Sequence, residues 1–380
     1  MIDVNTLQAR FPTLSHRVYL SSGSHGLLST DVQQAYAAYI NECLIYGANW
    51  EGWLGRYEAV RSSVARLLGA KSTEIAVTSS ASEGINALAS AFDFTGERNK
   101  IVVSNFEFPT SAQIWHAQEG RGGHVVHVRE SQDGYIPLES FEEAIDEHTK
   151  IVAISHVCYR HGAKLDVKGI AEIAKRKGAL LILDCYQSVG TEPLNVKELG
   201  VDFAVGGMMK YLLGSSGVGF LYIREELVES LTPSSSGWYA QADFFAMDIF
   251  ANNPSPTARR FEAGTPAVPG CFAAEAGLGI IHEFGIEAIG AHIRDLTGRC
   301  MDSLRESGWQ VVTPRDDLRR GPMVAIRSSD DAALVGRLAE NGIVTSCRDG
   351  NVRCGFHFYN GEEDVARLLR ALERHRDLGA

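Results

Sequence analysis

Short apolar runs alternate with amphipathic stretches along the middle of the chain. Seven such runs between residues 74 and 223 read EIAVTS, KIVVSNFE, HVVHVR, KIVAISHVC, ALLILDC, DFAVGGMM and GVGFLYI. The stretches between them predict helices, for example over 166–178, where Asp166 can cap the start and Gly178 can end the helix. Strands separated by helices predict an α/β fold with a mostly parallel central sheet flanked by helices.

The pattern changes after about residue 224. Residues 232–270 are rich in Pro, Ser and Gly and show little periodicity, which predicts a long functional excursion. Helical patterns over roughly 268–308 follow, and then a smaller α/β pattern with the apolar runs WQVVTP, MVAIRS and NVRCGFHFY. We therefore expect a large domain over 18–265 and a small C-terminal domain formed by 266–380 together with 1–17.

Composition and charge argue against several classes of protein. The formal net charge is −11, whereas a nucleic-acid partner would select a basic face, so we expect neither DNA nor RNA as a ligand. The seven cysteines form no C-x-x-C pair, so they fit neither a disulfide framework nor a zinc site, and no metal is expected. Cysteines without a disulfide framework favour a location in the cytoplasm. Residues 1–16 lack the features of a signal peptide, and no run of about 18 apolar residues occurs, so neither export nor a membrane span is expected.

A carboxylate and a lysine each follow a strand of the predicted sheet. Asp184 ends one apolar run and Lys210 follows another, at the sheet edge where ligands of open α/β sheets bind. The pair suits pyridoxal phosphate, because a partly desolvated lysine can bond to the cofactor's aldehyde while a carboxylate keeps the pyridine nitrogen protonated. Taken singly, Asp184 equally fits a helix cap or turn, and Lys210 fits an ordinary surface lysine.

The segment SSASEGIN at 79–86 joins a predicted strand to a predicted helix. Free N–H groups at a helix start, with the hydroxyls of Ser80 and Ser82, suit a phosphate dianion. Taken alone, the segment reads as a plain serine N-cap with Glu83 in the first turn. The segment GSSGVG at 214–219 precedes a strand rather than joining a strand to a helix, so it is interpreted as a turn and not as a dinucleotide site.

Longer stretches of the chain resemble one enzyme family. They are VTSSASEGINALA, NFEFPTSAQIW, the run from ISHVC at 154 to REEL at 227, RRFEAGTPAVPG and VRCGFHFYN. In this order, and over nearly the whole chain, they resemble the class V aminotransferase family of fold-type I pyridoxal phosphate enzymes, which includes cysteine desulfurases, kynureninases and isopenicillin-N-epimerase-like proteins. The resemblance implies the fold-type I architecture, pyridoxal 5′-phosphate as cofactor, an amino-acid substrate and a homodimer.

The resemblance also implies roles for residues around the cofactor ring. Lys210 corresponds to the lysine that bonds covalently to the cofactor, and Asp184 corresponds to the partner of the pyridinium nitrogen. Gln187 would lie near the phenolic oxygen. Phe108 matches the aromatic residue that stacks on the ring in kynureninases, whereas desulfurases have histidines in this region.

Four residues are implied as phosphate contacts. Ala81 and Ser82 would hold the phosphate, Ser82 through both backbone and hydroxyl. Thr265 matches a residue that reaches the phosphate of the neighbouring subunit in desulfurase-like members, and Trp238 resembles a kynureninase phosphate contact. The alternatives are a helix N-cap for Thr265 and a core position for Trp238.

Four further residues are candidates for substrate binding. Arg353 matches the arginine that takes the α-carboxylate through two parallel hydrogen bonds; its alternative is a strand-surface salt bridge. Tyr159 and Arg160 either contact the substrate or only pack against their loop. His25 lies in an N-terminal segment that lines the active-site mouth in this family, or else is a turn histidine.

Departures from the family pattern bear on the reaction. Desulfurases carry Ser and His where Gly207 and Met209 stand here, and the chain between Cys347 and Arg353 is too short for a mobile cysteine loop, so a sulfur relay is not expected. Kynureninases carry Asn and Tyr where Thr265 and Met209 stand, so kynurenine is not the expected substrate either.

The expected chemistry begins with a carbanion at the substrate's α-carbon. The local patterns favour β-side-chain cleavage or elimination, as in kynureninase-like or C–S-lyase-like enzymes. Transamination and epimerisation are the alternatives on the same site. A non-catalytic nucleotide-binding protein on the same α/β scaffold is the alternative of a different class, because a fold alone does not fix a function.

Overall fold

The computed structural model of the chain describes residues 7–131 and 133–380. Residues 1–6, which we expected to lack a targeting signal and to belong to the small domain, lie outside the described residues. Within the described ranges, no helix combines the length and the apolar character needed to cross a lipid bilayer.

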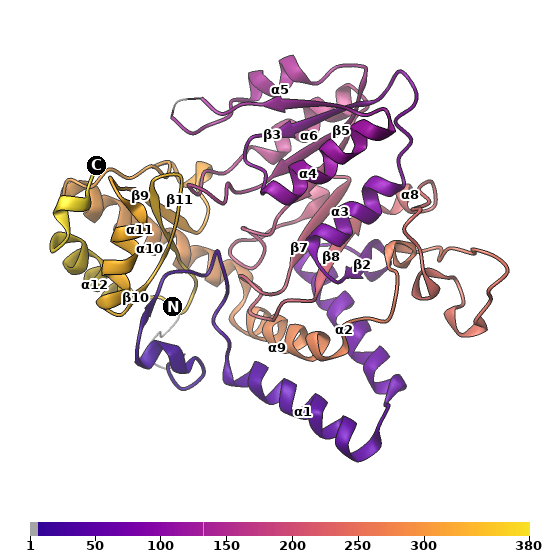
Figure 1. The fold of residues 1–380 in the computed structure, drawn as a ribbon, viewed down its shortest axis with the longest axis horizontal. Helices are drawn as coiled ribbons and strands as arrows, with labels where there is room; N and C mark the ends of the chain where they lie inside the picture. Colours follow the sequence, from indigo (N-terminus) through magenta and orange to yellow (C-terminus); the bar gives the residue numbers. More distant parts are fainter. Residues whose placement is uncertain (1–6, 132) are drawn as a thin grey trace.

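A seven-stranded sheet forms the centre of the molecule, in the order β2-β8-β7-β6-β5-β3-β4 (Figure 1). Its strands are β2 (Ile75–Thr78), β3 (Lys100–Ser104), β4 (His124–Val128), β5 (Thr149–Ser155), β6 (Leu180–Asp184), β7 (Phe203–Gly207) and β8 (Gly219–Ile223). Within the described residues, β8 alone runs in the direction opposite to the other six strands. Each of the seven apolar runs forms one strand, which confirms the predicted α/β fold with a mostly parallel sheet.

Helices cover both faces of this sheet, as its apolar strands require. The connecting helices are α3 (Ala81–Ser90), α4 (Pro109–Ala117), α5 (Leu138–Ala144), α6 (Val167–Arg176), α7 (Val196–Leu199) and α8 (Glu225–Val228). Ile101 and Val103 of β3 share one core cluster with Ile85 of α3, whereas Val102 shares another with Ile170 of α6. Because successive residues enter different cores, β3 is buried on both faces.

Three long helices pack together beside the sheet. They are α1 (Thr30–Tyr46), α2 (Trp50–Leu68) and α9 (Val268–Phe284), and α9 packs against both of the others. The side chains of Ser29 and Asn49 accept backbone N–H groups at the starts of α1 and α2, so these two residues fix where the helices begin.

A smaller α/β unit follows in the chain. It contains α10 (Ile286–Glu306), β9 (Met323–Arg327), α11 (Asp331–Glu340), β10 (Ile343–Val344), β11 (Ser346–Arg348), β12 (Asn351–Gly355) and α12 (Glu362–Glu373). Strands β11, β12 and β9 form an antiparallel sheet, and β1 (Val18–Tyr19) pairs in parallel with β10. The predicted domain boundary at residue 265 stays a prediction. Helix α9 begins just after this boundary but packs against α1 and α2, which belong to the predicted large domain.

The predicted excursion runs between α8 and α9. In the described chain, residues 232–267 hold only short 3₁₀ turns: η5 (Trp238–Ala240), η6 (Phe244–Ala246) and η7 (Ala258–Phe261). Figure 1 shows this segment projecting outward beyond β2. The turn η7 is anchored, because the Arg260 side chain donates to the carbonyls of Ser255, Val228 and Leu231.

Candidate active site

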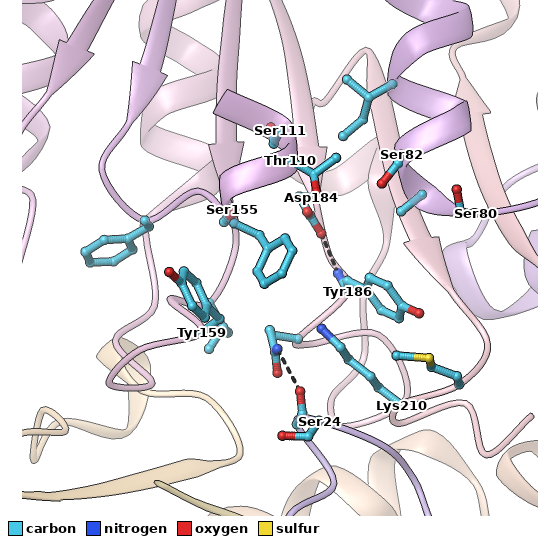
Figure 2. Close-up of a pocket in the computed structure, with 18 of the residues that line it drawn as sticks. Ser24, Ser80, Ser82, Thr110, Ser111, Ser155, Tyr159, Asp184, Tyr186 and Lys210 are labelled. Atoms are coloured by element: carbon cyan, nitrogen blue, oxygen red, sulfur yellow. Dashed lines mark hydrogen bonds between the residues drawn. The ribbon is translucent and has the colours of Figure 1, made fainter. Parts of the chain in front are cut away.

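A cavity of about 300 Å³ opens at the carboxyl ends of the central strands (Figure 2). Eight of the residues predicted from the sequence line it: Ala81, Ser82, Phe108, Tyr159, Asp184, Gln187, Lys210 and Arg353. They follow or end β2, β3, β5, β6 and β7, with Arg353 coming from β12 of the small unit. The ends of the large sheet's strands bring residues 81–210 together, as expected for an open α/β sheet, and the small unit adds Arg353, more than 270 residues from Ala81 in sequence.

Lys210 lies in an apolar part of this cavity. Its Nζ atom lies 4.1 Å from the centroid of the Tyr186 ring and 5.7 Å from that of Phe108. Burial lowers the pKa of Lys210 to about 8; Asp184 opposes this shift and Arg353 adds to it. A lysine that loses its proton near neutral pH suits covalent bonding to an aldehyde, because only the free amine is nucleophilic.

Asp184 faces the same cavity from the neighbouring strand β6. Figure 2 shows Lys210 pointing toward Asp184 and Tyr186. The Oδ1 atom of Asp184 accepts the backbone N–H of Tyr186 at 2.9 Å. Burial raises the pKa of Asp184, while this hydrogen bond and Lys210 lower it. A half-buried carboxylate in such surroundings is stabilised when a ligand cation lies against it.

The start of α3 forms one wall of the cavity. Ser80 is the N-cap, and its hydroxyl accepts the N–H of Glu83 at 3.1 Å, so the plain N-cap role considered for this residue is present. Ser82 lines the cavity from the first turn, where N–H groups and the helix dipole favour an anion. Gly219 permits this arrangement, because a Cβ atom there would lie 2.6 Å from the Ser80 carbonyl carbon and 2.8 Å from the Ala81 nitrogen.

The N-terminal segment closes another side of the cavity. Leu20 accepts a backbone hydrogen bond from Gly355 at 2.7 Å, and Gly26 donates one to Met209 at 2.8 Å. Gly23 and Ser24, between these anchors, line the cavity. The segment that precedes α1 thus connects the small unit to the loop that carries the lysine.

Arg353 is buried at the junction of the two units, with an exposed fraction of 5%. Its guanidinium donates to the Tyr159 carbonyl at 2.6 Å and to the hydroxyls of Ser346 and Ser24 at 2.9 and 3.4 Å. Burial and the nearby Arg348 lower its pKa. Hydroxyls and a carbonyl orient the guanidinium without neutralising it, which leaves its charge for an anionic ligand.

Unpaired polar atoms show that the cavity is built for a polar ligand. Within the described residues, Gln187 Oε1 and Arg353 Nε are buried and have no hydrogen-bond partner, although Gln187 Nε2 donates to the Gly23 carbonyl at 3.0 Å. A buried polar atom without a partner costs free energy unless a ligand satisfies it. A helix start, an amine, a carboxylate and a guanidinium around one cavity fit a phosphorylated pyridine aldehyde together with an amino acid.

Four of the predicted residues do not line this cavity in the single chain. Arg160 instead forms ion pairs with Glu130 at 2.7 Å and Asp349 at 3.1 Å. His25 is exposed and its ring bonds to the carbonyl of the next residue. Their roles stay predictions.

The two remaining residues also lie outside the cavity that holds the lysine. Thr265 is exposed and lines a separate cavity with Glu262 and Glu83. Trp238 packs against Trp50 and Phe244, with ring centroids 6.5 and 5.7 Å away. Neither position tests the phosphate contact that the resemblance implies.

Among the residues of the cavity region that were not recognised from the sequence, three bear on its charge and on the surroundings of Lys210. Glu107 follows β3 and is buried beside Ser104, Tyr186 packs under Lys210, and Arg348 lines the cavity from β11. Glu107 had a signal, since it is a carboxylate close to the end of a strand, as Asp184 is. For Arg348 the signal was the Asp349-Gly350 turn, which predicts a hairpin that sets Arg348 beside Arg353.

Comparisons with known proteins identify the family of this chain. Residues 51–368 match the family model described as aminotransferase class-V. An uncharacterized aminotransferase, YcbU, of Bacillus subtilis is 35% identical, with 94% of each chain covered. A kynureninase of Geobacillus thermodenitrificans is 27% identical over 94% of this chain and 88% of its own length.

Desulfurases are similar in both sequence and structure. A probable cysteine desulfurase of Halalkalibacterium halodurans is 28% identical over 99% of this chain and 98% of its own. The apo structure of a cysteine desulfurase from Thermococcus onnurineus superposes with a TM-score of 0.89 at 26% identity, covering 99% of this chain and 98% of that chain. The family model spans most of the sequence, and the predicted fold and cofactor are confirmed. This chain belongs to the class V aminotransferase family of pyridoxal phosphate enzymes.

Proposed function

We propose that this enzyme acts on an α-amino acid whose α-carboxylate is held by Arg353 and whose α-proton is removed by Lys210. The observation that supports this most directly is the half-buried Lys210 amine, which lies near the Tyr186 and Phe108 rings in the cavity that Arg353 also lines. A pKa of about 8 lets Lys210 accept and return a proton near neutral pH.

Pyridoxal phosphate, when bound, supplies an aldehyde that bonds to amines and a ring that accepts the electron pair of a bond broken at the α-carbon. Lys210 would hold it covalently, and Asp184 would keep its ring nitrogen protonated. The start of α3, with Ser82, would hold its phosphate. Burial of the Lys210 amine lowers its pKa and so favours the uncharged form that is nucleophilic.

We propose cleavage or elimination of a β-substituent as the outcome, with transamination as the second candidate. Among the described residues that line the cavity, there is no second lysine, no histidine and no cysteine. Epimerisation by two bases would need another proton carrier across from Lys210, and Tyr159 and Tyr186 are the lining side chains that could take this role. Burial raises the pKa of both phenols, so they give up a proton less readily, which favours the one-base reactions. Cys347 alternates with Ser346 and Arg348 along β11 and so lies on the opposite face of the hairpin from Arg353, which argues against a sulfur relay.

The test is an incubation of the holoenzyme with a panel of amino acids in D₂O. We expect a visible absorption band of lysine-bound cofactor, deuterium at the α-carbon, and products such as alanine or pyruvate that form without an added keto acid. Lys210→Ala should lose the band and the exchange, whereas the matched control Lys71→Ala, which removes an exposed amine, should keep both. Strict dependence of product formation on a keto acid would replace the lyase proposal by transamination, and absence of both band and exchange would contradict the enzyme proposal.

We also propose that the enzyme is a homodimer in which Thr265 of one subunit lies near the phosphate site of the other. In support, Thr265 is exposed and lies outside the cavity of its own chain.

We propose a cytoplasmic location because all seven cysteines, which fall within the described residues, are free thiols. Cell fractionation of the native host checks this proposal, and recovery outside the cytoplasmic fraction would contradict it.

A further inference from the structure

The hairpin of β11 and β12 brings a second arginine to the active site. Its two-residue turn is Asp349-Gly350, with φ angles of 52° and 71° as in a type I′ turn. Ser346 pairs with Arg353 and Arg348 pairs with Asn351. Arg348 and Arg353 are therefore diagonal neighbours on one face of the hairpin, a relation that brings long side chains within reach of each other.

Both arginines face the same cavity, from different depths. Arg353 is buried, whereas Arg348 is exposed and lines the cavity from its outer part. Burial and the positive charge of Arg348 both lower the pKa of Arg353. The two like charges therefore repel each other in the protein.

Nearby acids do not neutralise this pair. Within residues 7–131 and 133–380, neither Arg348 nor Arg353 forms an ion pair with a carboxylate, and the side chain of Arg348 donates only to the Cys347 carbonyl. The acid of the turn, Asp349, is paired with Arg160 at 3.1 Å. The hairpin thus holds two guanidinium groups toward the cavity with no protein anion between them.

We propose that Arg348 binds an anionic group at the end of the substrate's side chain, so that the enzyme selects amino acids that carry a second acid beyond the α-carboxylate. This inference rests on the proposed function, because it takes Arg353 as the site of the α-carboxylate. A substrate with two separated anions satisfies both guanidinium groups and relieves their repulsion, whereas a neutral side chain satisfies only one.

Two other ligands for Arg348 are less consistent with the geometry. The cofactor phosphate already has the start of α3, which approaches the cavity from β2 in the large sheet rather than from the hairpin. If both arginines bound one α-carboxylate, the exposed side chain of Arg348 would have to turn inward and lie beside the like charge of Arg353. A distal acid instead meets Arg348 where it stands, in the outer part of the cavity.

Matched pairs of nearly isosteric ligands test the proposal on the holoenzyme. L-aspartate is compared with L-asparagine, and L-glutamate with L-glutamine, by titrating the cofactor's absorption spectrum with each amino acid. We expect at least one acid to bind about tenfold or more tightly than its amide, the factor typical of one charge-assisted hydrogen bond. Arg348→Gln should bring this ratio close to one, Arg348→Lys should retain part of it, and Arg337→Gln, which removes an exposed arginine of α11, should leave it unchanged.

Each outcome decides the proposal. An acid-to-amide ratio near one in the wild type, or a ratio that survives Arg348→Gln, would overturn it. An equal loss of acid and amide binding in Arg348→Gln would assign Arg348 to the α-carboxylate and would also overturn it. Exchange of the α-proton of asparagine or glutamine in D₂O reports separately on the proposed function, so its failure is distinguishable from a failure of side-chain selection.

Discussion

Glu107 is a buried carboxyl group whose protonation affects the charge at the neighbouring Asp184. It is 8% exposed, its Oε1 atom accepts the Ser104 hydroxyl at 2.9 Å, and its Oε2 atom has no hydrogen-bond partner in the described chain. Burial and the charge of Asp184 raise the pKa of Glu107 to about 7. A carboxyl that keeps its proton up to neutral pH leaves the negative charge on Asp184, where the pyridinium partner is predicted.

The raised pKa predicts a pH-dependent difference in stability between the wild type and Glu107→Gln. A glutamate in the unfolded chain ionises near pH 4.3. Between that value and about 7, the folded protein holds a proton that the unfolded chain has lost, so this group's contribution to the free energy of unfolding falls as the pH rises through the window. Glutamine does not titrate, so the stability of Glu107→Gln relative to the wild type should rise by up to about 3 kcal/mol between pH 5 and 8.

Urea unfolding of the cofactor-free protein at four pH values across this range measures the difference. Glu340→Gln, which removes an exposed carboxyl, corrects for the loss of one acidic group. A relative stability of Glu107→Gln that stays constant with pH would show that Glu107 is ionised in the folded protein throughout the range.

At the scale of elements, the large sheet was predictable because its strands are buried on both faces. Such strands read as continuous apolar runs, and all seven were found. The strands of the small unit were harder to predict from the sequence. The run WQVVTP forms only one isolated bridge, Val311 to Ile326, because the Thr313 hydroxyl accepts the N–H of Ala325 and replaces the backbone ladder there. Short β11 was missed because three residues give too little pattern for a strand.

The candidate site also contains both residues that were predictable from the sequence and residues that were not. Asp184 and Lys210 were predictable because each ends or follows an apolar strand at the edge where ligands bind. Arg348 was not recognised, because its place beside Arg353 follows only once the Asp349-Gly350 turn is used to fix the register of the two short strands β11 and β12. The place of Tyr186 depends on packing: a Cβ atom on Gly207 would lie 2.6 Å from its ring, so the glycine that departs from the desulfurase pattern makes room for this tyrosine.

Gly219 of β8 lies against the start of α3, and this contact leads to a prediction about cofactor binding. Gly219→Ala should push the start of α3 away, because the added Cβ atom would meet the Ser80 and Ala81 backbone at 2.6 and 2.8 Å. We expect the affinity for pyridoxal phosphate to fall at least tenfold in a fluorescence titration, since the N–H groups of the first turn would shift from the phosphate. Gly279→Ala on the exposed side of α9 meets no atom within 4 Å and is the matched control; it should keep the affinity and stabilise the helix by about 1 kcal/mol. Unchanged affinity in Gly219→Ala would place the phosphate elsewhere.

At the scale of the whole molecule, two apolar segments stay exposed in the single chain. Leu44 and Tyr46, near the end of α1, are 79% and 71% exposed, and Ile249 and Phe250, in the excursion, are 85% and 93% exposed. Large exposed apolar side chains in groups are uncommon on monomeric proteins and mark surfaces that bind other proteins. With Thr265 also exposed, these segments are the expected contacts of the proposed homodimer.

The prediction is that the holoenzyme has the mass of two chains in light scattering, and that Ile249→Asp with Phe250→Asp converts it to a monomer. The monomer should also release the cofactor more readily, because Thr265 would no longer reach the phosphate of a neighbouring subunit. Leu318→Asp is the control, since Leu318 is 80% exposed but stands in a separate turn, η8 (Asp317–Arg319). Loss of the dimer with full retention of the cofactor would separate assembly from cofactor binding, and a wild type with the mass of one chain would contradict the homodimer itself. If the result is as expected, each active site would be formed by two subunits. One subunit would supply Lys210, Asp184, Arg348 and Arg353, and the other would complete the phosphate site with Thr265.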